Sequence, residues 1–212
     1  RYYAWKTGDE TTKKALAEWA DAWLIAAQST QKNKPEWIIP PSVEYPTKKI
    51  NGNEPTWYKA NMFWDYFDWG GSSALLDQFL FTWTLTGDDK YLVPIIKHLE
   101  LIQKHENGKQ IRSETGNFRP GSEFWAAQRL LKSDGFWNVI GVWRLLTGNE
   151  RFDELIIKHG SPYARYRLTG NTSHLVEGMK PFLETIRYNR PMLTTEVIHT
   201  DRVYIAPGRT RE

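Results

Sequence analysis

Four copies of one tripeptide, Thr-Gly followed by Asp or Asn, each stand at the end of an apolar run in this chain. They are Thr7-Gly8-Asp9, Thr86-Gly87-Asp88, Thr147-Gly148-Asn149 and Thr169-Gly170-Asn171. Glycine readily takes the left-handed conformation that ends a helix, and Asp or Asn caps the free N–H groups that begin the next one. Each copy therefore predicts a tight turn between two helices. Because helical hairpins repeated along a chain are typical of solenoids and toroids, we expect an all-α fold.

The periodicity of apolar residues predicts two kinds of helix. Residues 73–86 and 134–147 are apolar nearly all round, which predicts inner helices buried on every side. Their partners are amphipathic and predict an outer ring; these are residues 10–29, 89–105 and 149–159. Residues 161–169 predict a shortened inner helix, with 172–189 as its partner. From Pro191 the pattern indicates extended chain, so we expect a helical domain over 1–190 and a tail over 191–212.

The start of the chain indicates a missing part. Residues 1–6 lie where a hairpin's first helix should end, and the chain has no initiator methionine. We therefore expect this sequence to be a piece of a larger polypeptide, whose remainder packs against it.

Composition restricts the classes of function. The 28 basic and 25 acidic residues give a net charge of +3, too small to indicate nucleic acid or an anionic membrane as a partner. No apolar stretch approaches the roughly 20 residues of a membrane span. The absence of cysteine excludes disulfides and thiolate metal sites, and it suits a secreted or periplasmic protein. The five histidines show no metal-ligand spacing, so we expect neither a metal nor a cofactor.

The long connections indicate where function lies. Residues 31–71 and 107–132 are far longer than a helical bundle needs, and both fall at the end opposite the glycine turns. Long loops on a rigid scaffold are where binding and catalytic residues concentrate.

The first connection ends in a run of aromatic and acidic residues. Its candidates are the substrate-binding Trp57, Tyr58, Trp64 and Trp69 and the catalytic Asp65 and Asp68. The two aspartates are three positions apart, so on a helical turn they would face one side. Paired carboxylates among aromatic rings suit general acid/base chemistry, because apolar surroundings raise one pKa while the other carboxyl stays ionised. The alternative is that Asp68 caps the next helix and the rings only pack its entrance.

The second connection and one inner helix add further candidates. Glu123 is a candidate catalytic carboxylate, while Arg119 and Trp125 are candidate substrate-binding residues. The alternative for Glu123 is an ordinary first-turn glutamate favoured by the helix dipole. Asp77 lies in a strongly apolar helix, where an acid must be paired or functional, and we include it among the substrate-binding candidates.

With these turns, buried helices and aromatic loop, residues 1–190 resemble the (α/α) toroids of glycoside hydrolases and polysaccharide lyases. The resemblance implies part of such a toroid, with a sugar-binding cleft at the N-terminal ends of the inner helices. It favours hydrolysis of a poly- or oligosaccharide by a carboxylate pair drawn from Asp65, Asp68 and Glu123. Two alternatives stay open. One is a polysaccharide lyase, for which Tyr58, Tyr66, His199 and Arg119 are the candidate groups; the other is a non-catalytic helical-repeat module that binds a glycan or a protein.

Overall fold

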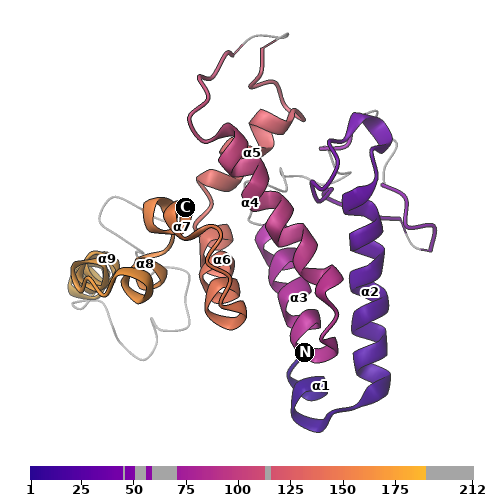
Figure 1. Cartoon of the computed structure of the whole chain (residues 1–212), viewed down its shortest axis with the longest axis horizontal. Helices are drawn as coiled ribbons and strands as arrows, with labels where there is room; N and C mark the ends of the chain where they lie inside the picture. The colour runs from indigo at the N-terminus through magenta and orange to yellow at the C-terminus, as the bar shows by residue number, and fades with distance from the viewer. Residues whose placement is uncertain (45, 51–55, 59–70, 113–115, 190–212) are drawn as a thin grey trace. The chain divides into compact units, whose positions relative to one another are not determined.

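The computed structural model describes residues 1–44, 46–50, 56–58, 71–112 and 116–189. The regular elements among these residues are all helices, which confirms the all-α class (Figure 1). One isolated antiparallel bridge joins Val43 and Ile50. The chain divides into two units, Arg1–Phe152 and Asp153–Glu212, which we call unit 1 and unit 2. The predicted boundary at residue 190 stays a prediction, because the predicted tail, 191–212, lies outside the described residues.

Unit 1 contains the elements on which the candidate site depends. They are α1 (Tyr2–Thr7), α2 (Glu10–Gln28), the short 3-10 helix η1 (Gln31–Asn33), α3 (Gly71–Thr86), η2 (Asp89–Leu92), α4 (Val93–His105), α5 (Glu123–Leu131) and α6 (Asp134–Thr147). Unit 2 contains α7 (Asp153–His159), α8 (Pro162–Thr169) and α9 (Ser173–Asn189). The helices predicted from periodicity are all present, most of them within two residues of the predicted bounds.

All four predicted turns form, and they share one hydrogen-bond pattern. The glycines take φ angles between 68° and 71°, the left-handed region. Each Asp or Asn side chain accepts a backbone N–H of the next helix or turn at 2.7–3.0 Å. The threonine side chain contributes two further hydrogen bonds, which the sequence analysis did not predict. Its hydroxyl donates to the carbonyl four residues earlier at 2.8–2.9 Å and accepts the N–H two residues later at 3.2–3.3 Å.

Helix α3 is the centre of unit 1, since it packs against α2, α4 and α6 (Figure 1). Leu76, Phe79 and Leu80 of α3 are at most 2% exposed. The turns that follow α1, α3 and α6 lie at one end of unit 1, the lower end in Figure 1, and the described parts of the long connections, 29–44, 46–50, 106–112 and 116–122, lie at the other. This is the arrangement that alternating antiparallel helices predict.

Two expectations about these helices were wrong. Residues 107–132 are not one long connection, because α5 occupies Glu123–Leu131, where Ser122 Oγ caps the helix by accepting Trp125 N–H at 3.1 Å. Helix α6 is not buried on every side either. Three apolar residues on it are 40–53% exposed; they are Val142, Leu145 and Leu146. Among the described helices of unit 1, α6 is the last and packs mainly against α3 and α5.

The turn after α3 gives the first testable prediction. Gly87 has φ +70°, and a Cβ built there meets no atom within 4 Å. Gly87→Ala should therefore lower the free energy of unfolding through backbone strain alone, by about 1 kcal/mol. Gly87→Asn is the matched control and should lose less, because Asn tolerates this conformation. Urea unfolding compares the two, and equal losses would contradict the strain argument.

Candidate functional site

The two long connections meet at the loop end of unit 1. Trp57, from the first, donates its indole Nε1–H to the carbonyl oxygen of Gly121, from the second, at 3.0 Å. The rings of Trp57 and Tyr58 lie 6.2 and 5.7 Å from that of Trp125 on α5, measured between centroids. The structure therefore brings together three of the predicted aromatic residues, which lie far apart in the sequence.

These rings are mostly core rather than a stacking surface. Trp57 is 2% and Trp125 3% exposed, while Tyr58 is half-buried. Gly121 allows the close approach: it has φ +87°, and a Cβ there would lie 2.5 Å from the Tyr58 ring. The aromatic cluster thus fixes the second connection to the first. Of its three rings, only Tyr58 is open enough for contact with a ligand.

Glu123 is the first residue of α5, as the helix-dipole alternative predicted. Its Oε2 lies 2.7 Å from Lys104 Nζ and 3.3 Å from His105 Nε2. The hydrogen bond from Lys104 is the main cause that lowers the pKa of the Glu123 carboxyl, and His105 adds to it. Glu123 is therefore held as a carboxylate. In that form it suits the role of hydrogen-bond acceptor, base or nucleophile, and does not suit that of proton donor.

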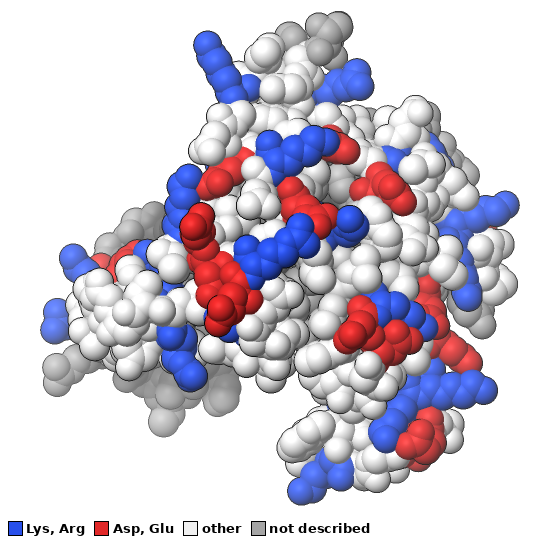
Figure 2. All heavy atoms as spheres, in the orientation of Figure 1, with Lys and Arg blue, Asp and Glu red and all other residues white. Residues whose placement is uncertain are grey.

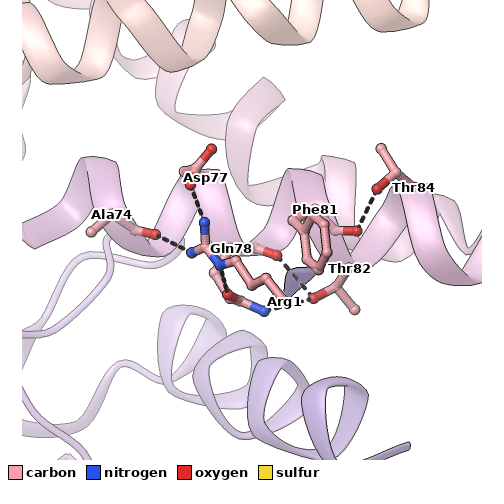
Figure 3. Close-up of polar contacts among 7 residues, drawn as sticks. All are labelled: Arg1, Ala74, Asp77, Gln78, Phe81, Thr82 and Thr84. Atoms are coloured by element: carbon pink, nitrogen blue, oxygen red, sulfur yellow. Dashed lines mark hydrogen bonds and ion pairs between the residues drawn. The ribbon is translucent and has the colours of Figure 1, made fainter. Parts of the chain in front are cut away.

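Asp77 on α3 is paired rather than isolated. It forms an ion pair with Arg1, whose Nε also donates to the side-chain oxygen of Gln78 (Figure 3). The guanidinium lies 5.7 Å from the centre of the Phe81 ring. Of the two cases that the sequence allowed, a paired acid or a functional one, the structure shows the paired acid, and the Asp77 side chain is 47% exposed. Its contacts link residue 1 to α3.

The other predicted site residues divide into two groups. Arg119 is exposed in the turn that also contains Gly121, close in sequence to Glu123. The remaining four lie outside the described residues; they are Trp64, Asp65, Asp68 and Trp69. Their catalytic and binding roles stay predictions.

A groove beside Glu123 is a feature that the sequence interpretation missed. It lies between residues 36–38, helix α4 and the start of α5, with a volume of about 220 Å³. Its lining residues are Glu36, Trp37, Ile38, Lys97, Glu100, Leu101, Lys104 and Glu123. On the face drawn in Figure 2, acidic and basic side chains lie side by side over α4. The groove thus combines one aromatic ring with several charged hydrogen-bonding groups.

Trp37 is the unusual residue of this groove. It is half-buried and has φ +66°, which is rare for a bulky side chain. Its backbone N–H donates to the carbonyl oxygen of Ala27, near the end of α2, at 2.7 Å. Strained backbone of this kind clusters at ligand-binding sites. The sequence did hold a signal for it, because Trp37 lies in a proline-rich connection rather than on a helical stripe.

The charges of the groove are arranged in pairs. Lys97 Nζ lies 2.9 Å from Glu100 Oε2, and Arg151 lies 2.7 Å from the other oxygen of Glu100. The hydrogen bond from Lys97, followed by that from Arg151, lowers the pKa of the Glu100 carboxyl. Glu36 is exposed at the groove and faces no cation within ion-pair distance among the described residues. The groove therefore offers fixed carboxylates and amines at neutral pH.

Other kinds of site are not found in the described part of the chain. No group of three or more acidic or histidine residues is placed there to hold a metal ion. None of the helices described is both long and apolar enough to cross a membrane. Comparisons with protein-family models, with curated proteins and with solved structures found no match to this chain. The function must therefore be inferred from the residues themselves.

The hydrogen bond between the two connections gives the second prediction. Trp57→Phe keeps an aromatic ring but removes the donor to Gly121, so it should lower the free energy of unfolding by about 1 kcal/mol or more. Trp19→Phe is the matched control, because Trp19 on α2 is 45% exposed. Thermal or urea unfolding measures both variants. The interpretation fails if Trp57→Phe is as stable as the control.

Proposed function

We propose that this chain is a helical domain of a carbohydrate-active protein and that it binds a glycan in the groove beside Trp37. The observation that carries the proposal is the pairing of the half-buried Trp37 ring with charged hydrogen-bonding groups in one hollow. A sugar ring has an apolar face of C–H groups and a rim of hydroxyls. An aromatic ring suits the first, and carboxylates and amines suit the second.

The size and charge of the groove restrict the kinds of ligand that it can hold. Pockets for drug-sized molecules are roughly 300–1,000 Å³, whereas this groove is about 220 Å³. It suits one ring of a longer chain that continues across the loop end, past Tyr58 and Arg119. Carboxylates of Glu36 and Glu123 would accept hydrogen bonds from hydroxyls, and Lys97 or Lys104 would donate to them.

The toroid arrangement belongs to the same proposal. It is supported by the four turns of one type and by the packing of α3 against α6, the two helices predicted to be inner. In such a ring, inner helices stand next to each other and present the same end to the ligand. The groove and the aromatic cluster both lie at the end of unit 1 opposite the turns (Figure 1).

Hydrolysis of the bound glycan is the second candidate function. The observation that favours it is the ionised state of Glu123, since a glycosidase needs one carboxylate as base or nucleophile and one protonated acid. In this scheme Glu123 is the base or nucleophile, and Asp65 or Asp68 supplies the proton. A non-catalytic module would use the groove without these roles.

Binding is tested by removing the aromatic ring. Trp37→Ala should weaken binding to the preferred oligosaccharide by about fivefold or more, since a well-packed aromatic contact at a binding site contributes about 1 kcal/mol or more. Calorimetry against a panel of neutral and uronate-containing oligosaccharides measures the affinity. Trp19→Ala, which removes an exposed tryptophan of α2, is the control and should bind as the wild type does. Absence of binding to every member of the panel, or equal binding by both variants, would refute the proposal.

Hydrolysis is tested separately on whichever polysaccharide binds. Glu123→Gln and Asp68→Asn should each slow the release of reducing ends by at least about a hundredfold if the two carboxyls act as base and acid. Glu18→Gln on α2 changes an exposed carboxylate outside the groove and serves as the control. Binding without any release of reducing ends by the wild type would leave the non-catalytic module as the function.

A further inference from the structure

Lys34 is a buried lysine whose ammonium group donates three hydrogen bonds. It is the residue directly after η1, and it is 2% exposed. Its Nζ donates to the carbonyl oxygens of Ala27 at 2.7 Å, Pro35 at 2.8 Å and Ile38 at 2.7 Å. An ammonium group has three hydrogens, and here each has an acceptor. Lysines are rarely buried, so this one needs an explanation.

The three acceptors connect the groove to the end of a helix. Ala27 lies in the last turn of α2, where carbonyl oxygens lack helical partners and favour a cation. The same Ala27 oxygen accepts the backbone N–H of Trp37 at 2.7 Å. Residues 35–38 therefore wrap around the Lys34 ammonium, and the three groove residues on this segment, Glu36, Trp37 and Ile38, are held through it.

We infer that Lys34 is the positioning residue of the groove: its ammonium fixes residues 35–38 on the end of α2 and so sets the place of Glu36 and Trp37. The positioning itself follows from the three hydrogen bonds. Only its consequence for a ligand rests on the proposed function. Lys34 is not among the residues that line the groove.

Few titratable groups face Lys34. Glu36, on its own segment, favours the ammonium form. From α4, the neighbour is His98, which is 1% exposed and has Nδ1 2.7 Å from the carbonyl oxygen of Pro94. Burial, with a smaller contribution from Lys34, lowers the pKa of His98 to about 4, so this ring is neutral above that pH. The end of α2, residues 25–28, carries no titratable side chain.

The protonation of Lys34 changes near neutral pH. Burial lowers the pKa of its amine to about 7, against the opposing effect of Glu36. The closed segment therefore binds the proton more weakly than an open segment, in which Lys34 lies in water with a pKa of about 10.4. By linkage, residues 35–38 are held less firmly at pH 6 than at pH 8.5.

Global stability should follow the same trend. The folded-state pKa of Lys34 lies below the unfolded value of about 10.4, so the unfolded chain binds more protons between these limits. The contribution of Lys34 to the unfolding free energy therefore rises with pH from about 7 upward.

Amide hydrogen exchange by NMR measures this trend at the segment itself. The measured quantity is the protection of the Trp37 amide, corrected for intrinsic exchange, at pH 6 and pH 8.5. In the wild type, protection should be higher at pH 8.5. Lys34→Met should lower it at pH 8.5 by about tenfold or more, since hydrogen bonds of the segment are lost, and should abolish its dependence on pH. Lys49→Met, an exposed lysine of the same connection, is the matched control and should behave as the wild type does.

Each outcome decides the inference. Unchanged protection in Lys34→Met, or the same pH dependence in variant and wild type, overturns it. If circular dichroism shows that Lys34→Met does not fold, the wild-type pH series decides alone, and protection that does not rise with pH overturns the inference. Calorimetry with the preferred oligosaccharide tests the effect of Lys34 on ligand binding in the groove. Binding by Lys34→Met with wild-type affinity overturns the effect on the groove, whereas lost protection in a protein that binds no glycan refutes only the proposed function.

Discussion

The Thr-Gly-Asx turn is the interaction on which the rest of this structure depends. Within three residues it satisfies the carbonyl and N–H groups left open at two helix ends, through the threonine hydroxyl, the left-handed glycine and the Asx side chain. A turn this short forces the next helix to run back beside the previous one. Repetition after α1, α3 and α6 places the short connections of unit 1 at one end, and the described parts of the long connections lie at the other (Figure 1).

At that other end, aromatic residues serve two different purposes. Trp57 and Trp125 are buried and join the two long connections, so their contribution is to the stability of the loop end. Trp37 is half-buried in a strained conformation at the edge of a groove, which is where an aromatic ring remains available to a ligand. A tryptophan-rich sequence therefore does not translate directly into a tryptophan-rich binding surface.

The charges of the groove are fixed by neighbouring cations. Lys104 and Lys97 lower the pKa of the Glu123 and Glu100 carboxyls, so both are acceptors at neutral pH. Such groups suit recognition of hydroxyls, and Glu123 also suits a base or a nucleophile. Lys34 plays a different part, because its ammonium is turned inward to carbonyl oxygens and shapes the wall that carries Trp37.

The sequence by itself determined the helices and their turns, because caps, left-handed glycines and apolar periodicity act over a few residues. The all-α class and the bounds of α2, α3 and α6 followed from those local signals. It predicted that both connections lie at the end opposite the turns, and Trp57 and Glu123 indeed lie at that loop end. Only the tertiary structure decided which rings are buried, that Asp77 pairs with Arg1, and that Glu36, Trp37 and Glu123 line one groove. These features depend on residues 20 to 90 positions apart, and their burial and charge are set by neighbours that no local pattern specifies.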